Sequence, residues 1–282
     1  MPSALISAAE LEQRLGDGSL AVLEVSFAES DDGYRAGHVP GAARAYWKDL
    51  LWHETDRSFA PPEELGRRLG ALGLGSGTTV VLAGDPVQFG TYAFWALASA
   101  GFDRLLVLDG GKEHWLLAGH PVSTEPVTRA PTAARAPARP PSSAAVVGRD
   151  EVLAAVAAGT PAILDFRSPE EYRGERVSPE HMGPVDHGAE RKGRIPGARH
   201  LYYRDLLEED WTLRAPEEIE ATLREIGVGS DGEVIGYCRL SHRASLGWFA
   251  FTQLLGMERV RVYDGSWTEW GSMVGMPVER DG

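Results

Sequence analysis

The chain contains a single cysteine, Cys238, and Arg239, His242 and Arg243 follow it within five residues. The thiolate is the nucleophilic form of cysteine, and nearby positive charge favours it over the thiol. A buried structural cysteine is the simpler interpretation, but it leaves the cluster of basic side chains unexplained. We therefore expect Cys238 to act as a nucleophile.

The surrounding residues predict that this cysteine stands between a strand and a helix. Residues 234–237 are a short apolar run typical of a buried strand, and residues 246–255 are apolar enough for a buried helix. The first N–H groups of a helix favour negative charge and disfavour cations. Arg239 and Arg243 at this place therefore indicate anion binding, whereas His242 either tunes the thiolate or caps the helix.

Length and composition indicate two soluble domains. The 282 residues suffice for two domains of ordinary size, with 43% hydrophobic and 24% charged residues. The net charge of −13 argues against nucleic-acid binding. The sequence shows no signal-peptide pattern and no run of the ~18 apolar residues that a membrane span needs. One cysteine excludes an intrachain disulfide, and we expect a cytoplasmic monomer with no membrane partner.

The second half of the sequence repeats the first. Matching stretches recur in the same order, which indicates a duplicated domain. The pairs are AVLEV (21–25) with AILDF (162–166), GHVPGAARAYWKDLL (37–51) with GRIPGARHLYYRDLL (193–207), residues 59–76 with residues 214–230, and VLDGGKEHW (107–115) with VYDGSWTEW (262–270).

The repeat and the composition predict the domain boundaries. Residues 123–143 are rich in Pro, Ala, Thr and Ser and predict a linker between domains 1–122 and 144–282. Within each half, helices alternate with continuous apolar strands, which indicates a parallel sheet covered on both faces. Sites in such sheets lie beyond the carboxyl ends of the strands, and Cys238 follows such an end.

The first copy lacks the reactive cysteine. Aligning Ser76 with Ser230 places Gly84 opposite Cys238, and Asp85 then stands opposite the first arginine of the loop. We therefore expect the N-terminal domain to be catalytically inactive and to cover or support the C-terminal one.

Three features together resemble the tandem-domain rhodanese (thiosulfate sulfurtransferase) family. They are the G-x-[IV]-P-G-A turn and the DG-x-x-x-x-W stretch in both halves, and the loop CRLSHR at 238–243. The resemblance covers nearly the whole chain outside the linker. It implies two α/β domains, each a parallel sheet of about five strands with helices on both faces. It also implies that Cys238 takes the outer sulfur of thiosulfate, releases sulfite, and passes sulfur from a persulfide to cyanide or a thiol.

The resemblance implies no cofactor, and further residues of the second copy have expected roles. Asp165 ends the strand that corresponds to the first copy's strand with Glu24, and Arg167 follows it. We expect the two to form an ion pair that braces the loop. Trp267 is expected to pack in the core or to wall the pocket. The residues expected to bind the donor are Arg239, Leu240, Ser241, His242, Arg243 and Arg194.

This chain departs from the family pattern in two places. Many family loops carry glycine where this chain has Ser241. The serine must therefore adopt the backbone angles that the glycine has there, or the loop must have a different conformation. Some members place an arginine where this chain has Glu171, and neither Arg167 nor Arg194 is a direct match for it. The loop begins Cys-Arg, which resembles the thiosulfate type, whereas loops that begin Cys-Gly suit mercaptopyruvate.

Other functions remain open at this stage. A mercaptopyruvate sulfurtransferase and a non-catalytic persulfide carrier would need the same thiolate. A cysteine phosphatase would place five residues between its cysteine and arginine, whereas Cys238 and Arg243 enclose four.

An insertion at 175–192, absent from the first copy, contains Glu180, His181, Asp186 and His187. Its spacing is not that of a zinc site, so we expect no metal there.

Overall fold

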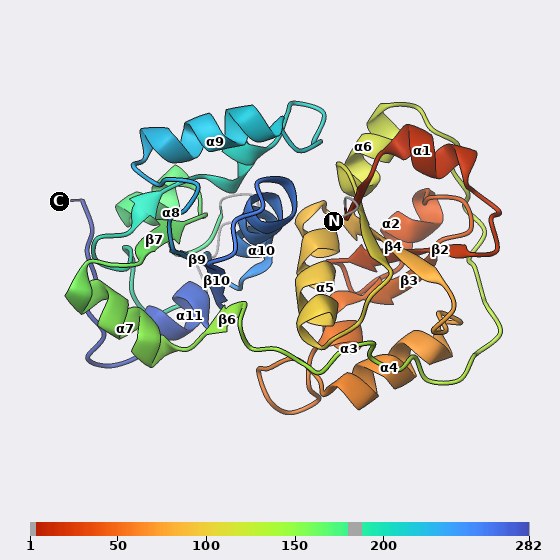
Figure 1. Ribbon diagram of the computed structural model, residues 1–282, viewed down its shortest axis with the longest axis horizontal. Coiled ribbons are helices and arrows are strands. Elements are labelled where there is room, and N and C mark those ends of the chain that lie inside the picture. Colours follow the sequence, from red (N-terminus) through yellow and green to blue (C-terminus); the bar gives the residue numbers. More distant parts are fainter. Residues whose placement is uncertain (1–3, 180–187, 282) are drawn as a thin grey trace. The chain divides into compact units, whose positions relative to one another are not determined.

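The computed structural model describes residues 4–179 and 188–281, which form two α/β units (Figure 1). The first unit comprises Met1–Ser142 with Glu209–Thr212, and the second comprises Ser143–Glu208 with Leu213–Gly282. Each unit contains one five-stranded parallel sheet, so the predicted fold class is confirmed. Within the described ranges, no helix combines the length and the apolar character needed to cross a membrane.

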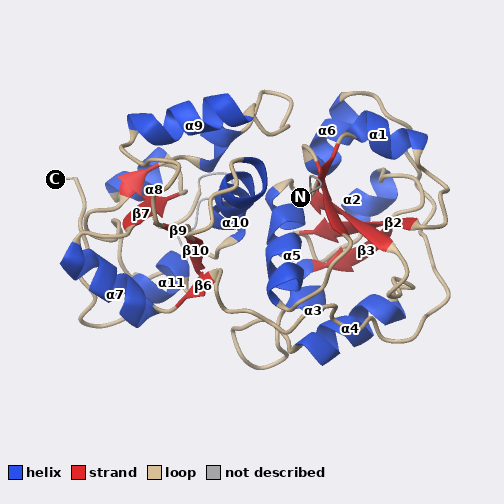
Figure 2. Cartoon of the chain, viewed as in Figure 1, coloured by secondary structure: helices blue, strands red, loops and turns tan. Residues whose placement is uncertain are grey.

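The sheet of the first unit has the strand order β1-β5-β4-β2-β3, and all its neighbours are parallel. Every residue of β2, an interior strand of this sheet, is buried, as expected for a strand covered on both faces. Figure 2 shows helices on either side of this sheet. The strands are β1 (Leu5–Ile6), β2 (Leu20–Ser26), β3 (Ala43–Tyr46), β4 (Thr79–Asp85) and β5 (Leu105–Leu108). The helices are α1 (Ala8–Gln13), α2 (Asp32–Ala36), α3 (Trp47–Leu51), α4 (Pro62–Ala71), α5 (Gln88–Ser99) and α6 (Gly111–Leu117).

The second unit repeats this topology with the order β6-β10-β9-β7-β8. The helix expected at 246–255 begins earlier and ends in a π-helical turn. The strands are β6 (Val146–Val147), β7 (Ala162–Asp165), β8 (Arg199–His200), β9 (Val234–Tyr237) and β10 (Val260–Tyr263). The helices are α7 (Arg149–Ala158), α8 (Pro169–Arg173), α9 (Pro216–Glu225), α10 (His242–Phe249) and α11 (Ser266–Trp270), with a 3₁₀ helix (Tyr203–Leu206) and a π-helix (Ala250–Leu254).

The proline-rich segment expected to be a linker has no helix or strand but packs on the first unit. Arg135 is only 2% exposed, and its guanidinium donates to three backbone carbonyls of that unit. Its backbone N–H donates to the carbonyl of Gly66 on α4, where a Cβ would lie 2.2 Å from the Arg135 carbonyl oxygen. Backbone hydrogen bonds to a glycine-lined helix thus replace the apolar side chains that the segment lacks.

The sheet registers show which residues of the two units correspond. In the first unit, Glu24 on β2 pairs with the residue before Gly84 on β4. In the second unit, Asp165 on β7 pairs with the residue before Cys238. The geometry of the two sheets therefore agrees with the alignment that sets Gly84 opposite Cys238.

Candidate active site

Cys238 directly follows β9 and is 1% exposed. Its backbone is held from the start of α11. The N–H of Cys238 donates to Ser266 Oγ at 3.3 Å, and its carbonyl accepts from the Trp267 N–H at 2.9 Å. The thiol therefore stands on a backbone fixed by strand and helix together, at the carboxyl edge of the sheet where such folds carry their sites.

The ring of Phe166 lies between β9 and α10. A Cβ added to Gly236 would lie 2.8 Å from the Phe166 ring, and one added to Gly247 would lie 2.2 Å from it. The two glycines therefore make room for Phe166, which is itself buried. This packing sets how α10 approaches the strand that ends at the cysteine.

Ser241 has φ +71° and ψ −15°, so it adopts the left-handed conformation that glycine takes up most easily. Its Oγ donates toward the Asp264 carbonyl (2.7 Å) and carboxylate (3.0 Å). A left-handed residue other than glycine costs about 1–2 kcal/mol, and hydrogen bonds of about 0.5–1.5 kcal/mol each offset that cost. The loop thus keeps the glycine geometry with a serine.

Arg239 is 9% exposed, and α11 also holds its backbone. Its carbonyl accepts from the Thr268 N–H at 3.2 Å and from the Thr268 hydroxyl at 2.8 Å. The guanidinium lies against Gly188, where a Cβ would be 2.6 Å from Nη1. The described end of the 175–192 insertion therefore reaches the active loop, which its sequence did not reveal.

The charge of Arg239 is costly where it stands. Burial lowers the pKa of Arg239 first, and repulsion from Arg243 lowers it further, whereas Glu171 and Cys238 raise it. A buried cation in that condition gains from an anion placed beside it. The surroundings of Arg239 thus suit an anionic group next to the cysteine.

Arg243 forms a bidentate ion pair with Glu171. Its Nη1 lies 2.6 Å from Glu171 Oε2 and its Nη2 lies 2.9 Å from Oε1. Burial alone would lower the pKa of Arg243, but Glu171 outweighs burial and raises it, and Cys238 raises it further. Arg243 is therefore close enough to Cys238 for electrostatic coupling, while two of its nitrogens are already engaged by the protein.

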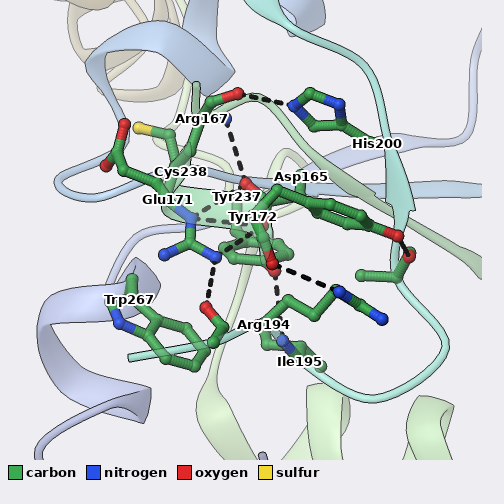
Figure 3. A network of polar contacts seen from close by, with 12 residues as sticks. Asp165, Arg167, Glu171, Tyr172, Arg194, Ile195, His200, Tyr237, Cys238 and Trp267 are labelled. Atoms are coloured by element: carbon green, nitrogen blue, oxygen red, sulfur yellow. Dashed lines mark hydrogen bonds and ion pairs between the residues drawn. The ribbon is translucent and has the colours of Figure 1, made fainter. Parts of the chain in front are cut away.

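The ion pair expected between Asp165 and Arg167 is present and fully buried (Figure 3). Arg167 Nη2 lies 2.6 Å from Asp165 Oδ2, and its Nε lies 2.9 Å from Oδ1. The Tyr237 hydroxyl donates to the same carboxylate at 2.5 Å. The Arg167 guanidinium also lies 4.5 Å from the Trp267 ring centroid. Trp267 is fully buried in the core. The network therefore holds Tyr237 and Trp267, the two residues that adjoin Cys238 in the chain and by a backbone hydrogen bond.

The structure does not bring Arg194 to the cysteine loop. Its guanidinium donates to Glu279 at 2.5 Å and to Asp281 at 2.8 Å, and it lies 4.4 Å from the Tyr172 ring centroid. In Figure 3 it lies at the opposite end of the drawn network from Cys238. The carboxylates near the C-terminus hold Arg194, so its geometry gives no support to the expected role in donor binding.

The remaining loop residues differ in exposure. Leu240 is partly exposed, whereas His242 opens α10 and is buried. The carbonyl of His242 accepts from the Ser245 hydroxyl at 2.7 Å, which ties the first turn of the helix together. Leu240 is thus the more accessible of the two.

Sequence reasoning missed several residues of this site. Ser266 and Thr268 hold the loop backbone, and Glu171 binds Arg243 instead of marking a lost arginine. Tyr202 also lies near the site. Burial raises its pKa, and the positive charge of Arg243 acts against that rise. Ser266 and Thr268 lie in the repeated DG-x-x-x-x-W stretch, and Tyr202 lies in the repeated stretch at 193–207. Membership of these repeated stretches was the signal that could have identified them.

Among the described residues, no group of three or more His, Cys, Asp and Glu side chains could hold a metal ion. Glu180, His181, Asp186 and His187 of the insertion lie outside the described residues.

Known proteins resemble this chain over nearly its whole length. A family model described as a rhodanese-like domain matches residues 7–118 and again residues 148–273. The chain is 37% identical over 284 residues to the "Sulfur carrier protein TtuD" of Thermus thermophilus, covering 99% of this chain and 97% of that protein. It is 36% identical over 276 residues to a "Putative thiosulfate sulfurtransferase" of Saccharopolyspora erythraea, covering 98% and 95%.

Solved structures of EanB are also similar to this chain. The wild-type structure superposes with a TM-score of 0.80 at 27% identity, covering 99% of this chain and 69% of EanB. A variant that carries a cysteine persulfide in the presence of ergothioneine gives a TM-score of 0.82, also at 27% identity, with 99% and 71% covered.

Proposed function

The chain belongs to the rhodanese family of sulfurtransferases, and from this premise we propose that it moves the sulfane sulfur of thiosulfate to a thiophilic acceptor through a persulfide on Cys238. One observation carries the proposal. The single thiol is buried at the β9–α10 turn, where two buried arginines of the same loop, Arg239 and Arg243, interact with it electrostatically. The positive charges of these arginines suit an anionic donor beside the nucleophile.

The reaction has two displacement steps. The Cys238 thiolate attacks the outer sulfur of thiosulfate, the S–S bond of the donor breaks, and sulfite leaves with the bonding electron pair. Cyanide or a thiolate then attacks the terminal sulfur of the persulfide. The new S–S bond breaks in turn, and Cys238 leaves as a thiolate ready for the next cycle.

The residues around the thiol have two roles, binding of the donor and positioning of the nucleophile. Arg239 and the first N–H groups of α10 would face the sulfonate oxygens, where charge-assisted hydrogen bonds are strong. Ser266 and Trp267 fix the backbone of Cys238. All these groups come from the second unit, and we propose a catalytically inactive N-terminal domain and a monomer as the working form.

A second candidate function is sulfur carriage without multiple turnover. The relative named as a sulfur carrier protein, at 37% identity over nearly the whole chain, favours it. Enzyme and carrier share the persulfide but differ in the second step, because a carrier would pass sulfur only to a dedicated partner. Steady-state turnover with a small acceptor therefore separates the two.

The test is the intact mass of the protein after incubation with thiosulfate. We expect one added sulfur atom, its removal by cyanide, and continuous release of thiocyanate when both reagents are in excess. Cys238→Ser should gain no sulfur and show no turnover. Turnover by Cys238→Ser would overturn the mechanism, whereas a stable persulfide that cyanide does not discharge would support the carrier.

A further inference from the structure

Glu171 is the carboxylate that pairs with Arg243 of the active loop, and groups from two elements fix it. It is fully buried, and its Oε2 accepts from the Ser168 N–H at 3.0 Å at the start of α8. Both of its oxygens also accept from the Arg243 guanidinium, at 2.6 and 2.9 Å. The side chain therefore has little freedom to turn away from the loop.

This carboxylate stays ionised in its buried position. Burial by itself would raise the pKa of Glu171, but Arg243 and then Arg167 outweigh burial and lower it. The positive charge of Arg243, next to Cys238, is thus matched by a fixed negative charge. A loop that looks doubly cationic in the sequence is less positive in the folded protein by one unit of charge.

We propose that Glu171 determines donor specificity by matching the site to a sulfane-sulfur donor with one negative charge. Organic thiosulfonates and hydropersulfide anions are donors of this class. Thiosulfate carries the same transferable sulfur but two negative charges, and the net charge of −13 on the chain adds to its repulsion. The inference rests on the proposed function and concerns which donor loads the same cysteine.

The step balances for either member of this class. The Cys238 thiolate attacks the outer sulfur, and the S–S bond of the donor breaks. A thiosulfonate releases a sulfinate with the electron pair, and a hydropersulfide releases a thiolate. In both cases Cys238 becomes the persulfide anion, so no oxidant, reductant or extra proton is needed.

The experiment compares kcat/KM for methanethiosulfonate and for thiosulfate at low salt, with cyanide as acceptor. Two charges near a protein surface interact strongly enough that removing one shifts a rate constant about tenfold. In Glu171→Gln the preference for methanethiosulfonate over thiosulfate should therefore fall about tenfold. Equal changes for the two donors would overturn the proposal, because they would mean that Glu171 only braces Arg243.

Two matched variants separate charge from shape. Glu170→Gln removes the same charge one residue away, from a partly exposed side chain that pairs with Arg173. Glu171→Asp keeps the charge and shortens the side chain. Both should keep the wild-type donor preference, whatever happens to their absolute rates. A change of preference in Glu170→Gln as large as in Glu171→Gln would also contradict the proposal.

The wild-type protein supplies an independent measurement if Glu171→Gln does not fold. Salt screens charge interactions, so a site matched to one negative charge should show no steeper loss of kcat/KM with salt for thiosulfate than for methanethiosulfonate. A steeper loss for thiosulfate would mean a site built for the dianion. Either result leaves the Cys238 persulfide, seen by mass, as a separate test of the proposed function.

Discussion

The two copies of the domain differ most where the strand before the active loop ends. In the second copy, Cys238 follows β9 and carries a buried thiol. In the first copy, a Cβ at Gly84 would lie 2.4 Å from the Val87 carbonyl oxygen and 2.5 Å from the Gly90 nitrogen. The backbone of α5 and its preceding turn thus fills the space of a nucleophile. The first copy lacks the room for a thiol as well as the cysteine itself.

The charged side chains near this point also differ between the copies. In the first copy, Lys112 replaces Trp267 of the second, and its Nζ lies 3.0 Å from both Glu24 and Asp85. Burial raises the pKa of Glu24 to about 7, against the opposing effect of Lys112. In the second copy the corresponding acid pairs with Arg167. The first copy therefore pairs its acids with a lysine, whereas the second places arginines next to a thiol.

Packing behind the loop shows a compensating exchange of volume. The second copy places a large ring against two glycines, whereas the corresponding residues of the first copy are a smaller aliphatic residue and two residues larger than glycine. The corresponding residues are Phe166, Gly236 and Gly247 in the second copy and Val25, Leu82 and Ala93 in the first. Each copy therefore carries its own combination of large and small side chains at these three places.

The largest expected effect comes from moving the nucleophile. The double variant Gly84→Cys, Cys238→Ser should show no thiosulfate turnover and gain no sulfur by mass, because the Gly84 site has no space for a side chain and is followed by Asp85. Cys238→Ser alone is the matched control. Any turnover by the double variant above this control would show that the first copy retains a working loop.

Arg239 provides the next contrast, because Asp85 stands at its place in the first copy. A hydrogen bond to a charged group contributes about 1.5–3 kcal/mol, so Arg239→Gly should lower kcat/KM for thiosulfate about ten- to a hundredfold. Mercaptopyruvate has one carboxylate and should depend less on this arginine. Equal losses for the two donors would mean that Arg239 shapes the loop instead of binding the donor.

The contrast between the copies was partly visible in the sequence. The internal repeat predicted two parallel sheets and set Gly84 opposite Cys238, because residues that correspond in sequence keep the same register. The partner of Arg243 was not predictable, since Glu171 lies 72 residues away and ion pairs between distant segments leave no periodic pattern. For the same reason the two carboxylates that hold Arg194 were missed.

A smaller effect on stability should come from Gly247. Gly247→Ala adds a methyl group against Phe166, and overpacking of this kind costs about 1–3 kcal/mol. Chemical denaturation should show the loss, and Phe166→Leu in the same chain should recover part of it by giving the methyl room. If Gly247→Ala is as stable as the wild type, the ring and helix are not tightly packed.

Ser241 should give the smallest effect, and its counterpart Val87 sharpens the comparison. Val87 has φ −46° and needs no left-handed residue, whereas Ser241 has φ +71°. Ser241→Gly removes backbone strain of about 1–2 kcal/mol but loses the hydrogen bond to Asp264, worth about 0.5–1.5 kcal/mol. The free energy of unfolding should therefore stay within about 1 kcal/mol of the wild type. Ser241→Ala keeps the strain and loses the bond, so it should be less stable than Ser241→Gly by about 1 kcal/mol. Equal stabilities of the glycine and alanine variants would mean that the left-handed geometry costs nothing here, and that the serine is retained for its hydroxyl alone.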